Sequence, residues 1–321
     1  MVSSLNDVYR SVEAEMHQVE AEMNRAVKTL TPQLAKAAAY SLARSGKRIR
    51  PLVTILASKL GNSDSAAVVR VAAALELVHL GSLVHDDIVD DSQLRRGKPS
   101  VNAQFDNKTA VLLGDFLFAR ALGLAGEVGL NAVQVVSSVI GSLVEGELTQ
   151  LSSSFDTSVT LADYYSRIRQ KTAWFLAECC RAGGLLSSGG PLSADELHAY
   201  GLNLGLAFQV KDDLLDFTSE SVTLGKPTML DLRQGVITLP VIHALANHPR
   251  RDEISAWIRA QKAENWDAIR HCLIEVGSLE FAEQQASELI ARAKSELERA
   301  PEHDAKAALL FLADFVLSRV S

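Results

Sequence analysis

"HDDIVDDSQLRRG" (His85–Gly97) follows directly on the apolar run "VAAALELVHLGSLV" (71–84), so a helix suited to a protein interior ends in four carboxylates and two arginines. Residues four apart on a helix lie on one face, about 6 Å from each other, so Asp86 and Asp90 converge. Like charges at that spacing repel by about 3 kcal/mol when the effective dielectric is about 20. A divalent cation would turn this repulsion into attraction, so the stretch predicts a metal site.

A second copy of the pattern, "FQVKDDLLDF" (208–217), also places Asp-Asp-x-x-Asp in an apolar helical context. A solvated helix end explains one such motif about as well as a metal site does, but two copies favour the metal site. Oxygen-only ligation suits magnesium, whose coordination is usually completed by substrate phosphates. We expect the two motifs to lie on helices that face each other across a cavity. The candidate metal ligands are Asp86, Asp87, Asp90, Asp212, Asp213 and Asp216.

Basic residues cluster in "SGKRIRP" (45–51) and in "LRRGKP" (94–99). Arginine binds phosphate oxygens through two parallel hydrogen bonds, and lysine acts as a point charge. Alone, each cluster is more often a solvated turn, and their closeness to the acidic motifs favours phosphate binding. His79 lies seven residues before Asp86 and eleven before Asp90. At 100° per residue the three share a stripe about 40° wide, so His79 is expected to face the same cavity.

The composition predicts an all-α protein. Hydrophobic residues make up 47% of the 321, whereas Gly (19) and Pro (8) are scarce, which favours helix. A net charge of -7 argues against a nucleic-acid binder, because such a protein needs a basic face. Three cysteines without a CxxC spacing argue against disulfides and zinc, and we expect a reducing, cytoplasmic location. Charged residues interrupt the most apolar stretches, so we predict no transmembrane helix and only a possible peripheral membrane contact.

Short breaks rather than linkers separate the helical segments. They fall at 61–65, 95–100, 152–160, 186–193, 221–228 and 247–250. Thr160 and Ser193 are predicted N-caps, the latter forming a capping box with Glu196. We therefore expect one domain over 1–321, a bundle of ten or more mostly antiparallel helices around a central cavity.

In this order the chain carries "GKRIRP", "HDDIVDDSQLRRG", "GDFLFAR", "EGELTQL", "KTAWF", "FQVKDDLLD", "GKP" and "DLRQGVITLP". This series resembles the all-trans polyprenyl diphosphate synthases, the polyprenyl synthetase family, over nearly the whole chain. The resemblance implies an isoprenoid synthase fold, a homodimer and a prenyltransferase. The chain departs from the family pattern at Val236, where short-chain members often carry Lys, and at Met229 and Leu230, where small residues are common.

The implied reaction begins with ionisation of an allylic diphosphate, continues with attack by the double bond of isopentenyl diphosphate and ends with loss of a proton. Three magnesium ions are implied at the six aspartates. The implied isopentenyl diphosphate ligands are Lys47, Arg50, His79 and Arg96, and the implied allylic diphosphate ligands are Arg95, Lys171 and Lys226. Thr172 and Gln209 are implied beside the reacting carbons, so that Lys171, Thr172, Gln209 and Arg95 form the implied catalytic group.

The residues before the first motif are expected to set the product length. Gly81 and Ser82 stand where synthases of short products tend to carry aromatic residues, and Val78 and Leu75 are candidates for the floor. Since "EGELTQL" looks like the long-chain members that make quinone side chains, we expect about six to ten isoprene units, an octaprenyl-like product, at roughly one unit per helical turn of depth.

Four alternatives stay open at this stage. Within the family they are a geranylgeranyl or a farnesyl diphosphate synthase. Outside it, a class I terpene cyclase shares the first motif but ordinarily lacks a second DDxxD. A non-catalytic synthase subunit would be expected to lack the aspartates.

Overall fold

The computed structural model describes residues 2–43, 46–218 and 229–319. The chain forms two units, which are interleaved along the sequence. Unit 1 holds residues 1–141, 178–198 and 299–309, and unit 2 holds 142–177, 199–298 and 310–321. The expectation of one domain over 1–321 stays a prediction.

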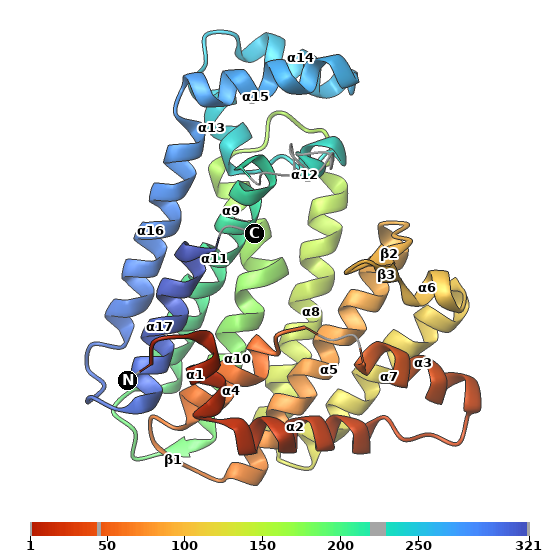
Figure 1. Cartoon of the computed structure of the whole chain (residues 1–321), viewed down its shortest axis with the longest axis vertical. Coiled ribbons are helices and arrows are strands. Elements are labelled where there is room, and N and C mark those ends of the chain that lie inside the picture. Colours follow the sequence, from red (N-terminus) through yellow and green to blue (C-terminus); the bar gives the residue numbers. More distant parts are fainter. Residues whose placement is uncertain (1, 44–45, 219–228, 320–321) are drawn as a thin grey trace. The chain divides into compact units, whose positions relative to one another are not determined.

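Unit 1 is built on two long neighbouring helices, α5 (Ser65–Val89) and α7 (Asn107–Gly126), which pack along each other (Figure 1). Asp64 caps the start of α5, because its side chain accepts a hydrogen bond from the N–H of Ala66 at 2.9 Å. The other elements of unit 1 are α1 (Leu5–Arg10), α2 (Glu13–Ala26), α3 (Pro32–Leu42), α4 (Ile49–Ser58), β1 (Asn62–Ser63), β2 (Leu94–Arg95), β3 (Lys98–Pro99), α6 (Val101–Gln104) and β4 (Ser187–Ser188).

Four helices contribute residues to both units: α8 (Leu130–Ser152), α10 (Trp174–Leu185), α11 (Ala194–Thr218) and α17 (Asp304–Ser318). Unit 2 otherwise consists of α9 (Leu161–Ile168), the π-helix η1 (Arg169–Ala173), α12 (Leu230–Arg233), α13 (Leu239–Asn247), α14 (Arg251–Ala260), the 3-10 helix η3 (Ala263–Asn265), α15 (Trp266–Glu275) and α16 (Ser278–Glu296).

The prediction of an all-α fold with ten or more helices is confirmed. Within the described residues, β-structure is limited to two antiparallel pairs of two-residue strands, β1 with β4 and β2 with β3. Both pairs lie at predicted breaks between helices. The predicted caps are confirmed as well: Thr160 and Asp163 form a capping box, and Ser193 exchanges hydrogen bonds with Glu196. The three cysteines are free and buried.

By length and composition alone, α5 and α7 could each cross a membrane, although the sequence predicted no such helix. The most apolar window of α5 is 72% buried within the structure, and that of α7 is 44% buried. Because the core helix of a globular protein passes the same test, this is weak evidence for a membrane span. Charged groups at the end of α5 agree with a core helix that presents a polar site.

We expect a methyl group at Gly183 to destabilise unit 1. A β-carbon there would collide with the carbonyl of Thr54 and lie 2.8 Å from both the Ala57 side chain and the Ser58 nitrogen. Gly183→Ala should lower the free energy of unfolding by about 1–3 kcal/mol, as measured by urea denaturation.

Gly141→Ala is the matched control, because a β-carbon at this helical glycine meets nothing within 4 Å. It should be neutral or stabilise the protein by up to about 1 kcal/mol. Equal effects of the two substitutions would contradict the described packing of α10 on α4.

Candidate active site

The first aspartate motif occupies the last turn of α5, where its members face different surroundings. Asp87 is buried, with 2% of its surface exposed, and one of its carboxylate oxygens lies 2.7 Å from Nε of Arg95. Asp86 is half-buried and Asp90 is exposed at the C-cap. Asp86 and Asp90 are therefore accessible to a cation, whereas Asp87 holds the following hairpin.

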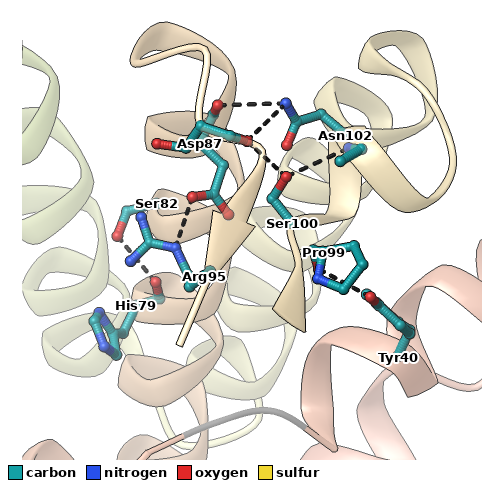
Figure 2. A network of polar contacts seen from close by, with 10 residues as sticks. Tyr40, His79, Ser82, Asp87, Arg95, Pro99, Ser100 and Asn102 are labelled. Carbon is teal, nitrogen blue, oxygen red and sulfur yellow. Dashed lines mark hydrogen bonds and ion pairs between the residues drawn. The ribbon is translucent and has the colours of Figure 1, made fainter. Parts of the chain in front are cut away.

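That hairpin, β2–β3, is fixed to α5 and α6 by a polar network (Figure 2). Ser100 donates a hydrogen bond from its hydroxyl to the carbonyl of Ser92 at 2.7 Å. Asn102 donates to the carbonyls of Asp87 and Ser92, and Tyr40 donates to the carbonyl of Pro99 at 2.9 Å. The network sets the position of Arg95 and Arg96 relative to the aspartates.

The two basic clusters of the sequence meet in unit 1. A β-carbon at Gly46 would collide with the guanidinium of Arg96, so the loop before α4 touches the β2–β3 turn. Burial, with Arg50 and Arg96 next in importance, holds the pKa of His79 well below its ordinary value. Arg50, Arg96 and a neutral His79 therefore lie together, and their assignment as diphosphate ligands stays a prediction. Lys47 is exposed at the same loop.

The second aspartate motif lies on α11 in unit 2, and Asp213 of this motif is turned inward. Its two oxygens accept hydrogen bonds from the amide of Gln209 at 2.8 Å and from the hydroxyl of Tyr164 at 2.8 Å. The hydroxyl of Thr172 in turn donates to the Gln209 carbonyl oxygen at 2.7 Å. Asp213 therefore orients Gln209 and Thr172, a role that the predicted metal ligation did not include.

Lys171 and Thr172 lie in the π-helix η1, a local widening that is frequent at functional sites. Glycines of α8 and α11 make room for it: a β-carbon at Gly146 would lie 2.8 Å from the Lys171 nitrogen, and one at Gly205 would lie 3.0 Å from the Ala173 β-carbon. The Lys171 ammonium pairs with Glu147 at 2.7 Å. "EGELTQL" thus contributes both a close packing position and a charge partner to this site.

Four carboxylates in unit 2 influence one another. Burial and the charge of Asp231 raise the pKa of Asp213 to about 7, and burial and Asp216 raise the pKa of Asp231 to about 6, although nearby Lys171 opposes the rise. Burial also raises the pKa of Asp212, in spite of its ion pair with Arg319 at 2.6 Å. This donor set has a surplus of negative charge, so it fits a divalent cation.

Sequence reasoning missed Asp231 as a site residue, although it quoted the motif "DLRQGVITLP" that contains it. The residue is brought to the cluster by Asp216, whose carboxylate accepts the N–H groups of Leu230 at 2.9 Å and Asp231 at 3.0 Å. Met229 is buried in a left-handed conformation with φ of 60°. The departures at Met229 and Leu230 therefore lie at the turn that presents Asp231.

The chain-length candidates lie along α5. Val78 and Leu75 are fully buried, and the half-buried Ser82 donates a hydrogen bond to the His79 carbonyl at 2.9 Å. A β-carbon at Gly81 would lie 2.8 Å from the ring of Phe118 on α7. Phe118 thus fills the space that the glycine leaves beside α5. The assignment of the chain-length residues stays a prediction, and Lys226 lies outside the described residues.

Among the described residues, the group of possible metal ligands within 4.8 Å of one another is His248, Cys272 and Glu275. The Nδ1 atom of His248 accepts the backbone N–H of Arg250 at 2.9 Å, so the ring proton resides on Nε2. Nε2 then donates to Glu275 at 3.0 Å. A metal-ligating histidine normally donates from its second nitrogen, so this arrangement is a hydrogen-bonded pair and not a metal site.

Comparison with known proteins places these features in a family. Residues 31–276 match the family described as polyprenyl synthetase. The heptaprenyl diphosphate synthase component 2 of Geobacillus stearothermophilus is 35% identical over 98% of this chain and 99% of its own.

Solved structures agree. A polyprenyl synthase of Caulobacter crescentus, complexed with calcium and isoprenyl diphosphate, is 35% identical, covers 100% of this chain and 99% of its own, and has a TM-score of 0.90. A decaprenyl diphosphate synthase of Rhodobacter capsulatus is 30% identical over 98% of this chain and 99% of its own, with a TM-score of 0.93. Geranylgeranyl pyrophosphate synthases share the fold at 27–30% identity, so the fold alone does not set product length. The chain belongs to the polyprenyl synthetase family and is a prenyltransferase with the isoprenoid synthase fold.

Proposed function

We propose that the protein condenses an allylic prenyl diphosphate with successive molecules of isopentenyl diphosphate to give a long-chain all-trans polyprenyl diphosphate. The observation that carries the proposal is the meeting of Arg50, Arg96 and His79 beside the first aspartate motif in unit 1. Each cycle breaks an allylic carbon–oxygen bond, forms one carbon–carbon bond, releases pyrophosphate and removes one proton. Pyrophosphate itself is the proposed base.

Charge and protonation at this cluster suit isopentenyl diphosphate. Arg50 and Arg96 carry fixed positive charge, and Lys47 lies exposed at the same loop. The lowered pKa of His79, caused by burial and then by Arg50, keeps its ring neutral near pH 7. A neutral ring donates a hydrogen bond to a diphosphate oxygen without adding charge. Arg95, held by Asp87, is the proposed allylic diphosphate ligand on the hairpin.

We propose magnesium as the divalent cation, in the three ions that the resemblance implies. Asp86 and Asp90 in unit 1 and Asp212, Asp216 and Asp231 in unit 2 are the proposed ligands. Bound cations would stabilise the charge that develops on the departing diphosphate. Burial, and then the charges of Asp231 and Asp216, raise the pKa values of Asp213 and Asp231, and a divalent cation beside these carboxylates would favour their ionised forms. The calcium in the Caulobacter relative supports a divalent ion.

The residues proposed beside the reacting carbons are polar but not nucleophilic. Thr172 and Gln209 present oxygen dipoles to a carbocation and are fixed by Asp213 and Tyr164. Cys179 in unit 1 is buried, and burial raises the pKa of its thiol to about 12. A protonated, buried thiol is a poor target for alkylation.

A product of about six to ten isoprene units, a quinone side-chain precursor, is the proposed length. The relatives at 30–35% identity include a heptaprenyl and a decaprenyl synthase, whereas the solved geranylgeranyl synthases stand at 27–30%. A geranylgeranyl product is the alternative within the family. Cytoplasmic location and membrane contact during product release stay predictions.

The active form is proposed to be a homodimer. Apolar side chains are exposed on α7, at 43% for Val111, 63% for Leu112 and 37% for Leu122. Val111 and Leu122 lie eleven residues apart and therefore on one stripe of the helix. Such a patch is typical of a protein interface. Because the Geobacillus relative is named component 2, a different partner chain is the alternative.

Sedimentation equilibrium at micromolar concentration should find a dimer for the wild-type protein and a monomer for Leu122→Glu, because the substitution places a charge in the proposed interface. Glu264→Lys, which changes an exposed side chain of η3, is the control and should leave the dimer intact. A monomeric wild-type protein would contradict the homodimer and favour a different partner chain.

Purified protein with magnesium, farnesyl diphosphate and labelled isopentenyl diphosphate should produce a ladder of products that ends at about six to ten units. Ser82→Phe should shorten the final product, because a phenyl ring at this half-buried position would block growth above Val78. Chromatography of the dephosphorylated products measures both.

Asp86→Ala should give no elongated products at all, whereas Ser82→Phe should give a ladder that ends at shorter products. A wild-type product of four units would replace the proposed length by the geranylgeranyl alternative. No elongation by the wild-type protein would contradict the proposed reaction and favour a non-catalytic subunit or a cyclase.

A further inference from the structure

Neighbouring basic residues of "GKRIRP" point in different directions. Lys47 is exposed and Arg50 is half-buried, whereas only 8% of Arg48 is exposed. The cause is local: Arg48 is the N-cap of α4 and has a left-handed backbone, with φ of 49° and ψ of 40°. This conformation is uncommon for a residue with a side chain. Strong contacts elsewhere must therefore hold it.

Two carboxylates from different helices provide those contacts. Nη1 of Arg48 donates to Glu76 on α5 at 2.9 Å, and Nε and Nη2 donate to the two oxygens of Glu20 on α2 at 2.6 and 3.2 Å. Glu76 is 2% exposed and lies one helical turn before His79. The guanidinium thus joins the diphosphate-binding loop to the helix that carries the aspartates.

The backbone of the loop is held as well. Tyr9 of α1 donates its hydroxyl to the carbonyl of Lys47. The Arg48 carbonyl accepts the N–H of Leu52 at 3.2 Å, which starts α4. These contacts fix the backbone at Lys47 and at the start of α4, which carries Arg50. Lys47 and Arg50 are the proposed diphosphate ligands.

The family match begins at residue 31, so Tyr9 and Glu20 lie before it. We propose that Arg48 is a positioning residue for isopentenyl diphosphate, and that α1 and α2 act through Tyr9 and Glu20 to hold the loop that presents Lys47 and Arg50. The inference rests on the proposed function, because it requires these two residues to bind that substrate.

The first test is steady-state kinetics of Arg48→Gln, Glu20→Gln and Tyr9→Phe. Each should raise the KM for isopentenyl diphosphate, by about tenfold for Arg48→Gln, because a misplaced ligand loses much of its effect. The KM for the allylic diphosphate should change less than twofold. Arg48→Lys should restore part of the lost affinity, because it keeps the charge but not the two-pronged contact with Glu20.

Arg25→Gln is the matched control on α2. Arg25 pairs with Glu22 and Glu127 at the surface, with 48% of its side chain exposed. Its substitution should leave both KM values unchanged. An equal rise in the KM for isopentenyl diphosphate would show a general effect of disturbing α2 and would overturn the inference.

The double variant Arg48→Met/Glu76→Leu separates positioning from stability. Replacing both members of a buried ion pair by apolar residues often preserves stability, so the melting temperature should stay near that of the wild type while the KM for isopentenyl diphosphate stays raised. If the double variant is stable and its KM for isopentenyl diphosphate equals that of the wild type, the ion pair has only a structural role and the inference is overturned.

Lys47→Ala distinguishes the inference from the proposed function. If it leaves the KM for isopentenyl diphosphate unchanged, the assigned binding loop is wrong and the inference falls with it. If it raises the KM while Arg48→Gln and Glu20→Gln do not, the proposed function stands and the inference alone is overturned.

Discussion

Repulsion between carboxylates that are crowded in a partly buried place is the constraint on which the rest of the structure depends. Asp213 and Asp231 have raised pKa values because burial and their acidic neighbours disfavour ionisation. The chain compensates for some of these charges itself, through Tyr164 and Gln209 at Asp213 and through Arg319 at Asp212. The proposed divalent cation would balance the negative charge that remains.

The backbone conformation, as well as the sequence, decides which arginines of the two basic clusters form ion pairs. Arg48 and Arg96 both have left-handed backbones, with φ of 49° and 53°. In each cluster one basic residue, Arg48 or Arg95, is paired with a carboxylate of α5. The ion pairs of α5 thus act as fixed supports, and among the other basic residues Arg50 and Arg96 lie near His79. This explains why most residues of α5 are apolar. A helix that holds charged groups in place at one end must be tightly packed along the rest of its length.

Part of the fold and of the candidate site could be predicted from the composition, the periodicity and the local chemistry of the sequence. The all-α class follows from composition, and the caps at Thr160 and Ser193 follow from neighbouring residues. The stripe of His79, Asp86 and Asp90 follows from spacing along one helix and stays a prediction. The roles of Asp213, Asp231 and Arg48 did not follow, because they depend on partners far away in the sequence: Tyr164 for Asp213, Asp216 for Asp231, and Glu20 for Arg48. The packing at Gly81 did not follow from the sequence for the same reason. The glycine's missing side chain makes room for Phe118 of another helix, and no pattern within α5 contains that information.

Calorimetric titration with inorganic pyrophosphate, at saturating magnesium and after its removal, tests the central claim most directly. If the carboxylates require a cation that pyrophosphate completes, wild-type protein should bind pyrophosphate tightly only with magnesium present. Asp212→Asn should weaken that binding by tenfold or more, since it removes a ligand that chelates the cation. Pyrophosphate binding that is equally tight without magnesium, and unchanged in Asp212→Asn, would contradict the account, because the arginines and lysines alone would then be sufficient.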